Sequence, residues 1–365
     1  MSETKQHLVF VTSCSPGDAG AITAFKLDTT TGTLEQSHRN TNVENPFFIA
    51  LSPNRKHLYS AHVTGDFESD TGSIAAFEIV GDSGELRKLN ERSAKGKTTC
   101  YVDVDPSGKA AVFANYTSGS IGSYPIEADG SLGEMTSFVE HQGASMVNEA
   151  RQESAHAHCS VISPSGKHMY ACDLGTDQIF GYALDAESAT LTALAQPYVR
   201  TIGGGGPRHF TYHPQGGYVY ANNELANSVN VYSHDESTGT LIEHQVISSL
   251  PDDYTGDSYT ADVKITPNGN FLYCTNRIHD SLASYRIGDD GCLTLIDIQS
   301  SLGSFAQNLA ITPDGSLLLC ANMQNPDGGD EGANVAVFRI AADSGKLTSV
   351  GDPVALGNPS CIMIA

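Results

Sequence analysis

Two short sequence units alternate along the whole chain, and this repeat constrains the fold more than any other feature. The first unit is an apolar segment, a turn that begins at a proline, and a second apolar segment that ends in Asn, Asp or His. Its six copies carry the turn prolines Pro53, Pro106, Pro164, Pro214, Pro267 and Pro313. These prolines lie about 50 residues apart, a period typical of repeat architectures and too long for a single hairpin.

The second unit is an apolar segment followed by acidic or polar residues and, in most copies, Gly-x-Leu. Its seven copies lie at 21–34, 73–86, 120–132, 178–191, 228–241, 281–293 and 334–347. Two hairpins in each period give four antiparallel strands, which is the content of one propeller blade. The sequence therefore predicts an all-β fold, a seven-bladed β-propeller of four-stranded antiparallel blades.

The two ends of the sequence explain why the first unit has only six complete copies. His7 to Ser13 resembles a second strand without a first, and Asn358 to Ala365 resembles a first strand without a second. We expect the two segments to pair in one blade and close the ring, because closure removes the exposed edges of an open array. We expect one domain over residues 1–365.

Composition excludes several classes of partner. The chain has 20 basic and 42 acidic side chains and a formal net charge of −22, which disfavours nucleic acids and anionic membranes. No apolar run approaches the roughly 18 to 20 residues of a membrane-spanning helix. The segment before Cys14 lacks the basic region and cleavage site of a signal peptide. We expect a soluble, cytoplasmic protein.

The eight cysteines never form a C-x-x-C pair, and most lie in apolar stretches. This pattern indicates buried free thiols and not a disulfide framework or a zinc site.

In an antiparallel blade, the first strand begins and the second strand ends on the same face of the disc. Residues at these points near the channel are the best candidates for a site. His156 and His158 lie at the start of one first strand, where alternation directs both to one side. Arg208 and His209 open the next first strand.

The ends of two second strands bring further polar residues to the same rim. One strand ends with Asn223 and Glu224, and the next ends with Arg277 followed by His279. Any one of these side chains alone is explained by a bond to a nearby carbonyl or carboxylate. Their convergence favours a functional site.

Three other kinds of site fit less well. Three histidines and a glutamate could hold zinc, but no H-E-x-x-H spacing is present and the arginines oppose a divalent cation. The glycine run at 203–206 lacks the Gly-Lys-Ser/Thr of a phosphate loop and precedes no predicted helix. No G-x-S-x-G motif is present, which argues against a serine hydrolase.

The motifs at this rim resemble those of the seven-bladed propeller lactonases. The matching stretches are ANYTSGSIGSYPIEADGSL from Ala114, RQESAHAH from Arg151, DLGTDQIFGY from Asp173, GPRHFTYHPQGGYVYANNE from Gly206 and TNRIHDSL from Thr275. This family includes cycloisomerase-type 6-phosphogluconolactonases and fungal 3-carboxy-cis,cis-muconate lactonizing enzymes. The resemblance extends over essentially the full chain.

The resemblance implies hydrolysis of a small anionic lactone, foremost 6-phosphogluconolactone of the pentose phosphate pathway, without a metal or other cofactor. The implied catalytic residues are Glu224, His158, His156, Arg208 and Arg277. The implied substrate-binding residues are Arg151, His209, Asn223, Asn276 and His279. In this hypothesis Glu224 takes a proton from water, the arginines hold the anion and the developing oxyanion, and His158 protonates the leaving ring oxygen.

Two positions depart from the family pattern. Ala155 replaces the usual proline before the His-Ala-His segment, and Gln307 stands where relatives commonly carry an arginine, so one contact to an anion is missing.

Three other functions stay open at this point: chemistry on another sugar lactone, muconate cycloisomerisation, and a non-enzymatic propeller that binds a protein partner. The connectors 133–154, 243–260 and 323–332 are expected on the same face, as loops or as parts of a lid.

Overall fold

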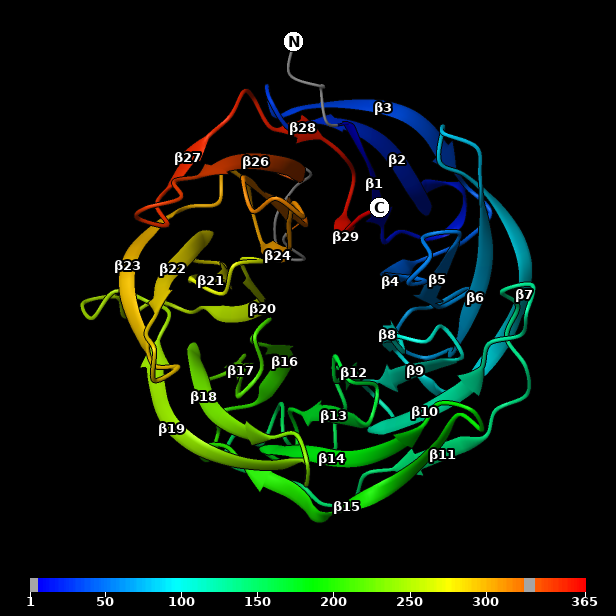
Figure 1. Ribbon diagram of the computed structural model, residues 1–365, viewed down its shortest axis with the longest axis horizontal. Helices are drawn as coiled ribbons and strands as arrows, with labels where there is room; N and C mark the ends of the chain where they lie inside the picture. The colour runs from blue at the N-terminus through cyan, green and yellow to red at the C-terminus, as the bar shows by residue number, and fades with distance from the viewer. Residues whose placement is uncertain (1–5, 325–331) are drawn as a thin grey trace.

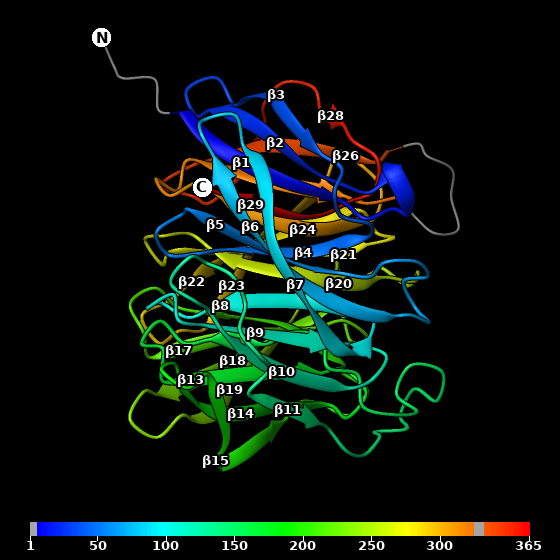
Figure 2. The same cartoon turned by 90° about the vertical axis from the view of Figure 1, so that its right-hand side faces the viewer.

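The computed structural model describes residues 6–324 and 332–365, and its strands form seven sheets arranged around a central axis (Figure 1). Six sheets have four antiparallel strands, and the seventh has a fifth strand beside them. The predicted seven-bladed propeller is confirmed. Figure 2 shows the disc from its side, with the sheets inclined to one another.

The strands fall into four concentric positions. The innermost strands are β29 (Pro359–Ile364), β4 (Pro46–Leu51), β8 (Thr99–Val104), β12 (Val161–Ile162), β16 (Pro207–Tyr212), β20 (Tyr259–Ile265) and β24 (Ala306–Ile311). The second strands are β1 (Gln6–Ser13), β5 (His57–His62), β9 (Ala110–Asn115), β13 (His168–Asp173), β17 (Tyr218–Asn223), β21 (Phe271–Arg277) and β25 (Leu317–Asn322).

The third and fourth positions complete the blades. The third strands are β2 (Ala21–Asp28), β6 (Thr71–Val80), β10 (Ser120–Pro125), β14 (Gln178–Asp185), β18 (Ser228–Asp235), β22 (Ser281–Ile287) and β26 (Asn334–Ile340). The outer strands are β3 (Thr33–Asn40), β7 (Glu85–Lys97), β11 (Ser137–Glu140), β15 (Thr190–Arg200), β19 (Thr240–Ser248), β23 (Leu293–Ser300) and β27 (Leu347–Ser349), with β28 (Val354–Ala355) also paired to β26.

Burial explains the sequence pattern of each position. Every residue of β9 and β25 is buried, because neighbouring blades cover both faces of a second strand. These strands are therefore continuously apolar up to their terminal asparagine. The outer strand β19 has a mixed, mostly exposed pattern, because one of its faces meets water.

The first and last strands close the ring as the sequence predicts. β29 pairs with β1 in antiparallel register, with Val9 opposite Ile364 and Val11 opposite Ile362. Side-chain bonds support the joint: the Thr12 and Ser360 hydroxyl oxygens lie 2.8 Å apart, and the Cys361 N–H donates to Thr12 Oγ1 at 2.8 Å.

Repeated tyrosines join neighbouring blades. The hydroxyl groups of Tyr59, Tyr170, Tyr220 and Tyr273, each in a second strand, donate to the carbonyl oxygens of Gly130, Gly239, Gly291 and Gly345. Each glycine lies in the turn before the outer strand of the following blade. Gly345 has a φ of +72° and lies against the ring of Phe271, so this turn tolerates no side chain.

The eight cysteines are all free; Cys292 is half-buried and the other seven are buried, so the prediction of buried thiols is wrong only for Cys292. The described residues contain one helix, η1 (Gly17–Ala19), and it is too short to cross a bilayer.

The inter-blade tyrosine bonds give a first prediction. Tyr59→Phe and Tyr273→Phe leave a buried carbonyl without its donor, so each lowers the free energy of unfolding by about 1–2 kcal/mol. Urea denaturation measures this change. Tyr212→Phe is the matched control, because the buried Tyr212 hydroxyl has no partner among the described residues. An equal loss in the control contradicts the assignment.

Candidate active site

A cavity of about 500 Å³ opens on the face where the innermost strands begin and the second strands end. It lies over the channel, which β4, β8, β16, β20 and β24 surround (Figure 1). Its lining residues are Phe47, Glu68, Thr98, Cys100, Tyr116, Arg151, His158, Arg208, Glu224, Arg277, Phe305, Gln307 and Met323. The predicted rim therefore contains a real hollow.

β-Bulges in the innermost strands supply one set of lining residues. The pairing register shifts between Pro46 and Phe48, between Thr99 and Tyr101, between Pro207 and Phe210, and between Ala306 and Asn308. The residue just after the start of each shift lines the cavity: Phe47, Cys100, Arg208 and Gln307. A bulge redirects one side chain without ending the strand, which is how the same backbone device presents four different groups here.

The ends of the second strands supply another set. Tyr116, Glu224 and Met323 each follow the terminal asparagine of such a strand, and Arg277 follows Asn276 within β21. The chain leaves the sheet at this point, so the side chain faces the cavity and not the blade interior.

Glu224 lies at the centre of the polar lining and contacts three arginines. Its Oε1 accepts from Arg151 Nη2 at 2.6 Å. Its Oε2 accepts from Arg208 Nε at 2.8 Å and lies 2.8 Å from Arg277 Nη2. Glu224 and Arg208 are almost completely buried. Three positive charges against one negative charge leave this cluster with a net +2, although the whole chain is strongly acidic.

The arginines decide the charge state of Glu224. Burial alone would raise the pKa of this carboxyl, but the charges of Arg277, Arg208 and Arg151 outweigh it and hold the pKa well below its usual range. Burial lowers the pKa of Arg277 to about 10, so its guanidinium is still charged at neutral pH. Glu224 and Arg277 are therefore both charged at pH 7.

His158 lines the cavity beside the arginine cluster. Burial, followed by the charge of Arg208, holds the pKa of His158 well below that of a free imidazole. Its Nε2 lies 3.9 Å from Glu224 Oε2, and its Nδ1 lies 3.9 Å from Cys100 Sγ. Burial raises the pKa of the Cys100 thiol to about 12, so this cysteine is not a nucleophile at neutral pH.

His156 does not line the cavity that His158 lines; it lines an adjoining pocket that shares Tyr116 and Arg151 with that cavity. The regular strand β12 begins only at Val161, and the segment before it is irregular. Tyr116 lies between the two histidines, stacked on His156 at 4.6 Å and edge-on to His158 at 5.2 Å between ring centroids. His156 lines an adjoining pocket of about 320 Å³ and contacts Glu153 there.

Three predicted substrate-binding residues do not line the cavity. Asn223 and Asn276 donate to Ser228 and Ser281, each five residues further along, inside their own blades. The Nδ1 of His279 lies 2.7 Å from the hydroxyl of Ser281. The side chains of Asn223 and Asn276 turn into the blade and satisfy polar groups there, which is the physical reason for the error at these two positions.

His209 lies behind Arg208 and does not line the cavity either. Its Nδ1 lies 2.8 Å from Asp262 Oδ1, and its Nε2 lies 3.1 Å from Arg208 Nη1. It therefore contacts the site through Arg208 and through its ring, which packs edge-on against His158 at 5.6 Å between ring centroids.

Arg151 reaches the cavity from the connector 133–154, which other loops hold in place. Gln152 Nε2 and the Gly206 N–H both donate to Asp177 Oδ1, at 2.7 and 2.8 Å. Asp177 Oδ2 accepts from the Gly204 N–H at 2.6 Å. The glycine run therefore bonds an internal carboxylate, which leaves neither of these two amides for a phosphate, and the connector is an anchored loop.

The other two connectors differ in what the structure describes. Within 243–260, Tyr254 packs edge-on against His279 at 4.4 Å between ring centroids. Most of the connector 323–332 lies outside the described residues.

Sequence reasoning missed the aromatic part of the site. Tyr116 is uncharged, and its hydroxyl oxygen accepts a hydrogen bond from Arg151 Nη2 at 3.2 Å. The guanidinium groups of Arg151 and Arg277 both lie over the ring of Tyr259. Tyr116 was recognisable by its place after Asn115, which matches the place of Glu224 after Asn223. Phe47 was not, because a bulge leaves no clear mark in one sequence.

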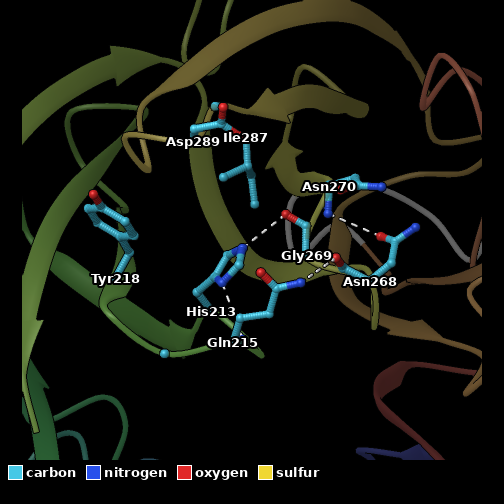
Figure 3. A pocket seen from close by; sticks show the side chains of 10 residues that line it. His213, Gln215, Tyr218, Asn268, Gly269, Asn270, Ile287 and Asp289 are labelled. Carbon is cyan, nitrogen blue, oxygen red and sulfur yellow. Dashed lines mark hydrogen bonds between the residues drawn. The ribbon is translucent and has the colours of Figure 1, made fainter.

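Two pockets lie at the turns on the opposite face, one of about 410 Å³ beside Lys26 and Arg55 and one of about 270 Å³. The smaller pocket lies between the turns that follow β16 and β20, and Figure 3 shows its side chains bonded to nearby backbone. His213 Nε2 contacts the Gly269 carbonyl at 3.0 Å, and Gln215 Nε2 donates to Asn268. Among the residues at 6–324 and 332–365, no three His, Cys, Asp or Glu side chains group as a metal site would require.

Comparison with known proteins agrees with this geometry. The family model of the seven-bladed beta-propeller lactonases matches residues 8–364. The chain belongs to this family. It is 30% identical over 358 residues to a 6-phosphogluconolactonase of Bacillus subtilis, covering 98% of each chain.

Two solved structures superpose over nearly the whole chain. A periplasmic gluconolactonase of Pseudomonas aeruginosa gives a TM-score of 0.90 at 27% identity, covering 99% of each chain. A Lactobacillus plantarum protein gives 0.87 at 30% identity, covering 99% of this chain and 100% of the other.

The arginine cluster predicts how the lactonase fold responds to loss of Glu224. Glu224→Gln leaves three arginines without their carboxylate, so the free energy of unfolding falls by about 3 kcal/mol at pH 7. The wild-type contribution is present above the ordinary carboxyl pKa and is lost as the pH falls through the depressed one, so the difference between the two proteins shrinks in acid.

Thermal unfolding with and without phosphate tests the cause of this loss. Phosphate replaces the missing charge, so it stabilises Glu224→Gln more than wild type. Glu187→Gln, in an exposed pair with Lys109, is the control and changes stability little. A Glu224→Gln protein as stable as wild type and indifferent to phosphate contradicts this role.

Proposed function

We propose that this protein is a 6-phosphogluconolactonase, which hydrolyses the ring ester of a small anionic lactone. One observation carries the proposal: three buried or half-buried arginines and an unprotonated histidine line one cavity. The B. subtilis relative, named 6-phosphogluconolactonase, supports the choice of substrate. Residues 1–365 form one catalytic domain in this proposal.

The arginines bind the anion. Each has nitrogen atoms beyond those that contact Glu224, and the net +2 of the cluster attracts a phosphate or carboxylate. Low exposure strengthens this attraction relative to water. The same charges stabilise the negative oxygen that develops on the lactone carbonyl.

His158 moves the proton. The neutral imidazole accepts a proton from water as the water oxygen bonds to the lactone carbonyl carbon. Glu224, 3.9 Å away, stabilises the resulting imidazolium. The tetrahedral intermediate then collapses, the bond from carbon to the ring oxygen breaks, and His158 returns the proton to that oxygen. The product is the open-chain hydroxy acid.

These roles differ in part from those expected from the sequence. Glu224 is a weak base because three arginines stabilise its charge, so in our proposal it orders the arginines and His158 accepts the first proton. All steps use side chains of this chain, and we propose that the reaction needs no metal.

The alternatives fit the site less well. A muconate-type cyclisation needs an acid beside an alkene, and His158 is deprotonated at neutral pH. A protein-binding scaffold presents its charged groups as exposed anchors, whereas Arg208 and Glu224 are buried in a hollow. The cytoplasmic location stays a prediction.

Kinetics with freshly generated 6-phosphogluconolactone tests the proposal. We expect acceleration above buffer, and a fall in kcat of about 10²- to 10⁴-fold in His158→Gln. His156→Gln is the matched control, because His156 lies beyond Tyr116, and its loss is much smaller. The activity persists below pH 6.5, since the pKa of His158 is depressed.

No acceleration by the wild-type protein contradicts the proposed function. Equal losses in the two histidine variants contradict the role of His158.

We expect the residue at position 307 to affect how strongly the site prefers a phosphorylated over an unphosphorylated lactone. Gln307 is buried, lines the cavity, and its Oε1 has no hydrogen-bond partner among the described residues. Gln307→Arg adds a fourth positive charge, so the ratio of kcat/KM for phosphorylated over unphosphorylated gluconolactone rises about tenfold, as for one charge-assisted hydrogen bond. An unchanged ratio places Gln307 outside the anion-binding part of the site.

A further inference from the structure

A buried hydrogen-bonded chain runs from the cavity into the propeller through Arg208, His209 and Asp262. Arg208 Nη1 lies 3.1 Å from His209 Nε2, and His209 Nδ1 lies 2.8 Å from Asp262 Oδ1. All three side chains are almost completely buried, and the carboxylate of Asp262 has no exposure to solvent.

The chemistry of the two outer groups fixes the tautomer of the histidine. A guanidinium can only donate, so Nε2 of His209 must be the acceptor and carry no proton. A carboxylate can only accept, so Nδ1 carries the proton and donates it to Asp262. Burial, followed by the charge of Arg208, lowers the pKa of His209 to about 4, which agrees with a neutral ring at pH 7.

Asp262 is itself held from two neighbouring strands. Its Oδ2 accepts from Asn308 Nδ2 at 2.7 Å and from the Leu309 N–H at 2.9 Å, both in β24. Its Oδ1 also accepts from Lys264 Nζ at 2.8 Å in β20. The carboxylate is therefore fixed across the boundary between two blades. Because His209 bonds this carboxylate, the position of its ring is fixed as well.

The bonds of Arg208 leave one nitrogen available. Nε donates to Glu224, and Nη1 donates to the Ala261 carbonyl and to His209. Within the described ranges, Nη2 has no partner. A buried guanidinium N–H without an acceptor is unfavourable, so an acceptor in the cavity at Nη2 would stabilise Arg208.

We propose that Asp262 and His209 are positioning residues for Arg208, which fix the guanidinium so that Nη2 is presented to the anionic group of the substrate. The proposal rests on the proposed function only for the identity of that substrate. Neither residue lines the cavity, and both act on the anion through Arg208. His209 also packs edge-on against His158 at 5.6 Å between ring centroids, so phosphate binding, in which His158 transfers no proton, is the decisive readout.

Two substitutions of His209 distinguish the effect of its bond to Asp262 from the effect of its bond to Arg208. His209→Asn places an amide N–H near the position of Nδ1, so it keeps the bond to Asp262 but has no atom that reaches Arg208. His209→Gln places its amide oxygen near the position of Nε2, so it keeps the acceptor for Arg208. Both variants lose ring volume, so a purely structural role predicts similar losses.

The first measurement is binding of inorganic phosphate by calorimetry, followed by kcat/KM for 6-phosphogluconolactone. In His209→Asn we expect both to fall about 10- to 100-fold, the effect of a lost hydrogen bond to a charged group. In His209→Gln we expect a clearly smaller loss. Circular dichroism and thermal unfolding select variants that are folded.

Asp262→Asn tests whether the carboxylate acts through the histidine. All partners of Asp262 are donors, so the NH2 group that Asp262→Asn introduces cannot accept from them and His209 loses its fixed position. We therefore expect Asp262→Asn alone to weaken phosphate binding. In a His209→Asn background the same change has little further effect on binding, as coupled residues are non-additive.

Equal losses in His209→Asn and His209→Gln overturn the proposal, as does wild-type phosphate affinity in His209→Asn. Phosphate binding also separates this inference from the proposed function. A wild-type protein that binds phosphate but does not hydrolyse the lactone refutes the function and leaves the role of His209 to be decided by the two variants.

Discussion

The ion pairs between Glu224 and three arginines are the interaction on which the rest of the site depends. Arg151, Arg208 and Arg277 come from three different blades or their connectors, and like charges at this distance repel one another. A single buried carboxylate makes their approach favourable. It also leaves positive charge in excess, so an acidic protein can present a cationic hollow to a small anion.

The sequence predicts the fold well because the structure repeats. One short apolar segment alone could be a strand or part of a helix, but seven copies of the same pattern indicate strands. The segments at 7–13 and 358–365 are the two halves of one hairpin pattern, and they pair with each other. Position within the repeat also predicts Glu224, Arg208 and Arg277 at one rim. It does not predict that His156 lines an adjoining pocket, because β12 begins only at Val161 and the residues before it are not in a regular strand.

Asn223 and Asn276 show why the rest of the site was harder to predict. An asparagine recurs at this position in several blades, where its amide bonds a serine five residues later. A residue that recurs in many blades stabilises the blade itself, and the residue after it differs from blade to blade. Tyr116, Glu224 and Arg277 differ from one another at that second position. The bulged residues, such as Phe47, depend on backbone register, which one sequence does not reveal.

The pairing of β1 with β29 has a consequence for how the protein is made. The blade that begins at residue 6 lacks its innermost strand until residue 364 has left the ribosome. Until then the ring is open, although the blades that carry Arg208 and Arg277 contact each other directly through β16 and β20. Closure of the ring is therefore a long-range step that joins the two ends of the repeat, whereas the hairpins within each blade form from neighbouring segments.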